Sequence, residues 1–285
     1  MTVKPVIDSF FEFDLSIFKG VIVLLFLFTG ACAGSTQFKK INLEQLQTRL
    51  LGQFDERQSV SADAVLRLET PEGKLQQHGS MVVSNHGQMR LDIRGPHGGV
   101  LLVLVIDGTK LYFLDLQAGR YVESATDNQQ VAEVFPFLPP LSLGRHWGDM
   151  LLGNIEPGEG AKLRTLDSGE HVLIWEQMTL VSEMVKTNTG LDVWSQKKSL
   201  LEHHLRVNAY SCEVLGYTIF SKSAQLLKID YEKWRSDGFI EQMKIVLPQR
   251  ETVLELSFRD VQKNLDFSPN IFKLKVPKGV RKEIW

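Results

Sequence analysis

The feature that most constrains the fold of this chain is a long series of short segments in which apolar and polar residues alternate. In residues 64–69, for example, Ala64, Leu66 and Leu68 share one face and their neighbours share the other. Turn signals separate the segments, and Asp107-Gly108 is a strong hairpin signal. Alternating segments joined by short turns indicate adjacent antiparallel strands rather than a repeat of β–α–β units.

Apolar residues recur at helical intervals in two regions, before the first of these strands and in the middle of the chain. One amphipathic helix is expected from about residue 41 to Gly52, because Leu43, Leu46 and Leu50 recur at helical intervals. In the middle of the chain, one helix is expected at residues 127–135 and another from Ser142 to Gly153. Strands are predicted at residues 64–69, 75–84, 89–94, 100–106, 111–116, 121–123, 161–167, 171–187, 191–196, 200–209, 214–221, 225–231, 240–247, 252–260 and 270–276.

These segments follow one another without a long linker rich in proline, glycine or serine, which favours one domain. The expected class is α+β, mostly antiparallel β: an open half-barrel of about ten strands with helices covering its concave face. The residues that face inward are almost wholly aliphatic or aromatic. A space left between sheet and helices would suit an apolar ligand such as acyl chains, and the alternative is a packed core without a cavity.

An apolar run at residues 21–32 follows Lys19 and ends in Gly30, Ala31 and Cys32. It is shorter than the roughly 20 residues of a membrane-spanning helix, and its order of residues is typical of a secretory signal peptide. Thr-Gly-Ala-Cys is similar to the lipobox of bacterial lipoproteins, in which Cys32 is lipidated; the alternative is an ordinary cleaved signal. The expected organisation is a signal peptide with an over-extended start or long leader (1–31), a lipidated tether with the N-terminal helix (32–55), and the half-barrel domain (56–285).

Composition narrows the classes of function. The formal net charge is −2 and no basic block occurs, which argues against a nucleic-acid partner. The sequence has two cysteines, so lipidation of Cys32 would leave Cys212 without a disulfide partner in the same chain. A hydrophobic content of 43% is ample for a core that holds the domain without such a bond.

Motifs for catalysis or metal binding are missing from the sequence. It contains no Gly-x-Ser-x-Gly elbow, no phosphate-binding glycine loop and no His-Glu-x-x-His. His203 and His204 are adjacent in a predicted strand, so they point to opposite faces and cannot chelate one metal ion. We therefore expect no enzyme, no cofactor and no metal; an exported lipid hydrolase would need a nucleophile that the sequence does not reveal.

Four features occur in a recognisable order, best over residues 55–175. They are the lipobox, a strand that enters a Gly-Pro-x-Gly turn and leaves as an apolar strand (90–106), the hairpin at 107–121, and a proline-rich break before His146-Trp147 and Leu151-Leu152-Gly153. In these features the chain resembles the LolB family of outer-membrane lipoprotein receptors and, more distantly, their periplasmic carrier LolA.

The resemblance implies a lipoprotein anchored by lipid in the outer membrane and facing the periplasm. It would receive the acyl chains of other lipoproteins from a LolA-like carrier and assist their insertion into the outer membrane. Ala33 after the lipidated cysteine is compatible with that location. The turn that inserts cargo carries an apolar residue in the family, usually leucine, whereas the matching turn here is Pro96, His97 and Gly98.

The expected acyl-chain cavity is lined by inward positions of several strands and of one helix. A competing hypothesis is a non-catalytic envelope sensor or assembly scaffold that uses the same fold as a protein-docking surface and fills the cavity with its own side chains. The expected lining residues are Leu66, Leu68, Met81, Val83, Leu91, Ile93, Leu102, Leu104, Tyr112, Leu114, Trp147 and Leu151.

Overall fold

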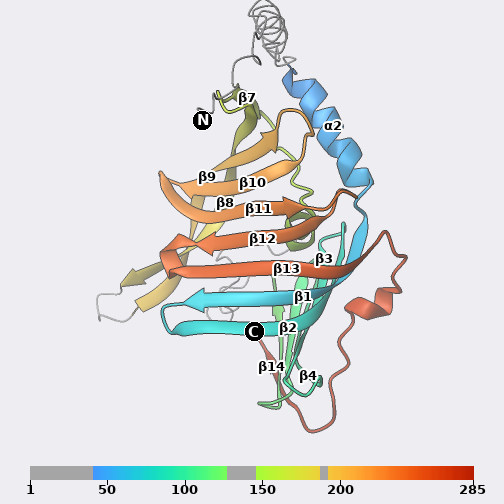
Figure 1. Ribbon diagram of the computed structural model, residues 1–285. Coiled ribbons are helices and arrows are strands. Elements are labelled where there is room, and N and C mark those ends of the chain that lie inside the picture. Colours follow the sequence, from blue (N-terminus) through green and yellow to red (C-terminus); the bar gives the residue numbers. More distant parts are fainter. Residues whose placement is uncertain (1–40, 127–145, 187–191) are drawn as a thin grey trace, which may run out of the picture. The chain divides into compact units, whose positions relative to one another are not determined.

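A computed structural model describes residues 41–126, 146–186 and 192–285, which belong to one compact unit, Ile41–Trp285. The described residues of this unit form one sheet of 14 strands in the order β14-β6-β5-β4-β3-β2-β1-β13-β12-β11-β10-β9-β8-β7 (Figure 1). Neighbouring strands are antiparallel except β14 and β6, which are parallel. The mostly antiparallel, unclosed sheet agrees with the prediction, but the predicted count of about ten strands was too low.

The elements have the following bounds. The α-helices of the described residues are α2 (Leu43–Asp55) and α4 (Trp147–Leu152), and short 3-10 helices lie at η3 (Pro248–Arg250) and η4 (Pro269–Phe272). The strands are β1 (Ser59–Thr70), β2 (Gly73–Ser84), β3 (Gln88–Arg94), β4 (Val100–Asp107), β5 (Lys110–Asp115), β6 (Arg120–Ala125), β7 (Lys162–Thr165), β8 (Glu170–Lys186), β9 (Asp192–Asn208), β10 (Val214–Ser221), β11 (Ala224–Trp234), β12 (Ile240–Leu247), β13 (Thr252–Lys263) and β14 (Arg281–Ile284).

Most predicted elements are present, with two corrections. The predicted strands at 191–196 and 200–209 form one strand, β9. The predicted strand at 270–276 was wrong: Ser268 caps η4 by accepting from the backbone N–H of Asn270, and the edge strand is β14 instead. The predicted helix at 127–135 and residues 142–145 of the next helix lie outside the described residues.

The sheet bends, so that β3 and β4 run in a different direction from β1, β2 and β11–β13 (Figure 1). Its largest hydrophobic cluster combines residues of β1–β6 and β8–β13 with Leu46 and Leu50 of α2 and Trp147 of α4. A second cluster on the opposite face joins Val103 and Val105 to Phe272 of the C-terminal segment. Strand β4 is buried on both faces, as its unbroken apolar run predicted.

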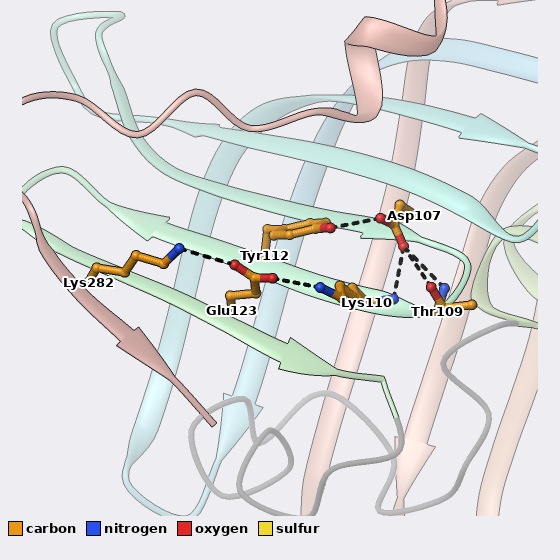
Figure 2. Close-up of polar contacts among 6 residues, drawn as sticks. All are labelled: Asp107, Thr109, Lys110, Tyr112, Glu123 and Lys282. Carbon is orange, nitrogen blue, oxygen red and sulfur yellow. Dashed lines mark hydrogen bonds and ion pairs between the residues drawn. The ribbon is translucent and has the colours of Figure 1, made fainter.

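Polar side chains fix the hairpin between β4 and β5 and tie β14 to the sheet (Figure 2). Asp107 accepts hydrogen bonds from the backbone N–H of Lys110 at 2.9 Å and from the Tyr112 hydroxyl at 2.9 Å. Glu123 on β6 pairs with Lys110 at 2.8 Å and with Lys282 of β14 at 3.4 Å. These contacts lie at one end of the strand order.

In the part of the chain that the structure describes, no helix is long and apolar enough to cross a membrane.

Candidate functional site

An apolar cavity of about 160 Å³ lies among β1–β4, β13 and α4. With the exception of Gln77, its lining consists of aliphatic side chains, methionines and one tryptophan. No charged residue of the described chain lines it. The lining residues are Leu66, Leu68, Leu75, Gln77, Met81, Met89, Leu91, Ile93, Leu102, Leu104, Trp147, Leu151, Leu254 and Leu256.

The two-residue repeat of side-chain direction along each strand brings these residues onto one face of the sheet. Leu66 and Leu68 of β1 are directly opposite Leu256 and Leu254 of β13 in the antiparallel register. The other strands contribute alternate residues in the same way, because every second side chain of a strand points to the same face. The cavity is therefore the place where the apolar faces of five adjacent strands meet without complete filling.

Helix α4 forms one wall of this cavity through Trp147 and Leu151. It lies so close to the turn between β2 and β3 that a Cβ on Gly148 would be 2.7 Å from the backbone oxygen of Ser84. The Tyr231 hydroxyl donates to the backbone oxygen of Met150 at 2.6 Å, and Gly153 ends the helix in the left-handed conformation with φ of 71°. Contacts on several sides thus hold the wall in place.

The cavity has a mouth near the turn between β1 and β2. Leu75, which lines it, is 52% exposed, and Leu68 is partly exposed. Both also line a neighbouring depression of about 370 Å³ that carries charged groups, including the ion pair between Lys74 and Glu69 at 2.7 Å. The charged residues of this depression alternate with Leu68 and Leu75 along β1 and β2, so they lie on the opposite face of the sheet.

The structure brings most, but not all, of the expected cavity residues together. Val83 is fully buried in the same core without lining the cavity. Tyr112 and Leu114 lie on the opposite face with the second cluster, because β5 directs Leu111 and Phe113 inward. The expected residues that do line the cavity are Leu66, Leu68, Met81, Leu91, Ile93, Leu102, Leu104, Trp147 and Leu151.

Five lining residues were not among those expected: Leu75, Gln77, Met89, Leu254 and Leu256. The alternation of β3 and β13 contains a signal for Met89, Leu254 and Leu256, since each lies on an apolar face of its strand. The sequence contains no local signal that β13 pairs with β1, because the two strands lie far apart in the chain.

The turn expected to insert cargo into a membrane joins β3 to β4 and is exposed. The Gly98 N–H donates to the Gly95 oxygen at 2.9 Å, and Gly98 has a φ of 79° that favours glycine. Pro96 and His97 lie at the tip of this turn. Its role at a membrane stays a prediction.

His203 and His204 lie on opposite faces of β9, as predicted: His203 is buried and its Nδ1 is 2.6 Å from the Tyr217 hydroxyl, whereas His204 pairs with Glu202. Within the described ranges, no three His, Cys, Asp or Glu side chains are grouped to hold a metal ion. Cys212 is buried, and Cys32 lies outside the described residues. The prediction that the chain is not an enzyme stays a prediction.

Comparisons with known proteins extend only to the fold. No family model matches the sequence, and no curated protein matches it. A DUF1329 family protein from Desulfovibrio piger has a similar structure, with a TM-score of 0.53 and 12% identity over 80% of this chain and 94% of that one. At this identity the likeness shows a shared fold alone.

Two further solved structures are similar at lower scores. One is a LolA superfamily protein from Nitrosomonas europaea, with a TM-score of 0.49 and 11% identity over 80% of this chain and 97% of that one. The other is a putative outer membrane lipoprotein-sorting protein domain from Vibrio parahaemolyticus, with a TM-score of 0.48 and 12% identity over 81% of this chain and 97% of that one.

Proposed function

We propose that this chain is an envelope lipoprotein that binds acyl chains of other lipoproteins in its apolar cavity and assists their insertion into the outer membrane. The observation that carries the proposal is the cavity itself, because its lining offers an acyl chain apolar contacts and no charge. Each methylene that leaves water for such a lining contributes about 0.8 kcal/mol.

The size of the cavity limits how much of a ligand it takes. A dry apolar cavity of about 150 Å³ binds benzene in another protein, so a cavity of about 160 Å³ accepts the end of one acyl chain. The rest of the chain would leave through the mouth beside Leu75. A ligand with its remaining apolar surface outside the mouth is suited to transfer, since a second apolar environment can receive it.

The cellular context of the proposal rests on the sequence. The lipobox at Cys32 supports a lipid anchor, and Ala33 after it is compatible with the outer membrane, on its periplasmic side. A LolA-like carrier would then be the donor of cargo. The exposed turn of Pro96, His97 and Gly98 is the proposed contact with the membrane, although it lacks the apolar residue that such turns carry in the LolB family.

Binding of a fluorescent palmitoylated peptide tests the proposal. The full chain carries Cys32→Ala in every sample, so that it is not acylated itself. Leu102→Glu and Leu75→Glu place a carboxylate in the lining and at the mouth, and we expect each to weaken binding about tenfold or more, because a charge is costly in an apolar site. Fluorescence anisotropy gives the Kd.

Leu116→Glu is the matched control, since Leu116 is 41% exposed and does not line the cavity. Circular dichroism and thermal melting check that all variants fold. Unchanged affinity in both cavity variants would refute acyl-chain binding at this site. Absence of binding in every sample, including the unsubstituted cavity, would favour the scaffold hypothesis, in which α4 and the surrounding side chains fill most of the concave face.

A further inference from the structure

A second, larger cavity of about 640 Å³ shares helix α4 with the apolar cavity. Trp147 and Leu151 line the apolar cavity, whereas Asp149 and Met150 line the larger one. At 100° per residue, these two pairs point to different sides of the helix. Helix α4 is therefore a wall between two cavities of different chemistry, and we call the larger one the polar cavity.

Negative charge is concentrated around the polar cavity. Its lining includes the carboxylates of Asp55, Asp149, Glu156 and Glu159, and no lysine or arginine of the described residues lines it. Only Asp149 has a potentially charged partner in the structure described, the His146 ring at 3.9 Å. The other three carboxylates are exposed to solvent and form no ion pair within the described ranges, so no described side chain balances their charge.

The aromatic side chains that line the cavity carry no positive charge. Trp175 and His203 are stacked with ring centroids 5.1 Å apart, and Tyr217 stacks beside them. Burial, with a smaller contribution from His204, lowers the pKa of His203 to about 4, and burial also raises the pKa of Tyr217. Both side chains are neutral near pH 7, so neither offsets the negative charge of the carboxylates on the rim.

Arg57 is a buried cation of the described chain that does not line the polar cavity. Its guanidinium lies over the ring of Trp234 at 4.6 Å, and its backbone oxygen accepts from Nδ2 of Asn154 at 3.0 Å. That contact orients the Asn154 amide, since a carbonyl can only accept. The other amide atom of Asn154 must therefore be the acceptor Oδ1.

Two residues of the lining have buried polar atoms that lack a partner. Oδ1 of Asn154 and Nε2 of His203 form no hydrogen bond within the part of the chain that the structure describes. Both side chains are more than nine-tenths buried. Buried polar groups without partners are uncommon and destabilising, so a ligand that donates a hydrogen bond to Oδ1 of Asn154 would supply what this acceptor lacks.

We propose that the polar cavity binds an organic ammonium ion, with its N–H groups directed to the carboxylates and to Asn154 and its carbon atoms against Ile155 and Leu201. The carboxylates are not grouped as metal ligands within the described residues, which fits an extended organic cation better than a metal ion. An ammonium group of this kind occurs in free polyamines and in lipid headgroups. The inference does not depend on the proposed function.

Isothermal titration calorimetry of the full chain tests it with three probes: spermidine, dihexanoyl phosphatidylethanolamine and, as an anionic counterpart, dihexanoyl phosphatidylglycerol. The cavity variant Asp55→Asn/Glu156→Gln/Glu159→Gln removes three exposed carboxylates of the rim. The control variant Glu72→Gln/Glu176→Gln/Glu232→Gln removes three exposed carboxylates that line none of the cavities. Both variants change the net charge equally.

We expect the cavity variant to lose about tenfold in affinity for the ammonium probe that binds, and the control variant to lose little. High salt should weaken binding to the unsubstituted chain, because the rim is exposed to solvent. Binding of spermidine would identify a free amine as the ligand, and binding of the ethanolamine lipid alone would identify a headgroup. Equal losses in both variants, equal binding of the glycerol lipid, or no saturable binding of either ammonium probe would overturn the proposal.

Discussion

His203 illustrates how burial changes the chemistry of one side chain. The residue is 3% exposed, and its pKa of about 4 lies well below the value of about 6.5 for histidine in an unfolded chain. Between these two values the unfolded chain binds a proton that the folded chain does not. The stabilisation is therefore complete above about pH 6.5 and is lost as the pH falls toward about 4.

The replacement His203→Phe keeps an aromatic ring beside Trp175 and removes the titration. We expect the free energy of unfolding of the unsubstituted protein to fall by roughly 2 kcal/mol more than that of the variant between about pH 7 and about pH 4.5. Urea unfolding at the two pH values measures the difference. The pKa of His171 is lowered by burial too, so a smaller pH dependence remains in the variant.

His78→Gln, on the exposed surface of β2, is the matched control for the loss of a histidine side chain. An identical loss of stability in the His203→Phe variant and in the unsubstituted protein would contradict a low pKa for His203.

Among the elements, α4 contributes lining residues to both cavities although it has only six residues. A helix of this length is not stable by itself, so its position comes from tertiary contacts. The backbone of Gly148 makes one close tertiary contact. A Cβ added there would lie 2.7 Å from the oxygen of Ser84, 3.1 Å from Cα of Gly87 and 3.2 Å from the oxygen of Gln88. All three neighbours are backbone atoms and cannot rotate away.

We expect Gly148→Ala to destabilise the protein by about 1–3 kcal/mol and to weaken binding of the palmitoylated peptide, because α4 must move. Gly52→Ala is a matched control in helix α2, where nothing lies within 4 Å of an added Cβ. There alanine should stabilise by about 0.5–1 kcal/mol through its higher helix propensity. Chemical denaturation compares the two, and equal stability of both variants would contradict the close packing of α4.

The elements also show how far the sequence predicts the fold. Strands β10 and β12 begin and end at the predicted residues, because period-two alternation and turn residues are local signals. The inward face of β5 was predicted wrongly at Tyr112 and Leu114, since both faces of this strand are apolar and both are buried. The polar cavity could not be predicted at all, because its lining comes from segments between Leu51 and Tyr217 that only the fold brings together.

At the scale of the whole molecule, the C-terminal segment covers an apolar face of the unclosed sheet and one of its two edges. After β13 the chain leaves the sheet and returns to it as β14 (Figure 1). On the way, Phe272 closes the second hydrophobic cluster over β4 and β5. The short strand β14 then covers the edge of β6, whose backbone groups would otherwise be free to pair with another chain.

Removal of residues 281–285 tests this role of β14. It deletes the backbone hydrogen bonds from Arg281 to Gly119 at 2.8 Å and from Trp285 to Glu123 at 2.9 Å, together with the ion pair between Arg120 and Glu283 at 2.9 Å. The core residues of β6 remain, so the shortened chain should still fold but expose an unpaired edge. We expect it to associate edge to edge. Size-exclusion chromatography with light scattering would then give a mass that rises with concentration more steeply than for the full chain.

Arg281→Ala is the control, because it removes an exposed side chain and keeps the strand, and it should behave as the full chain does. An unchanged mass of the shortened chain would show that β14 is not needed to protect the edge.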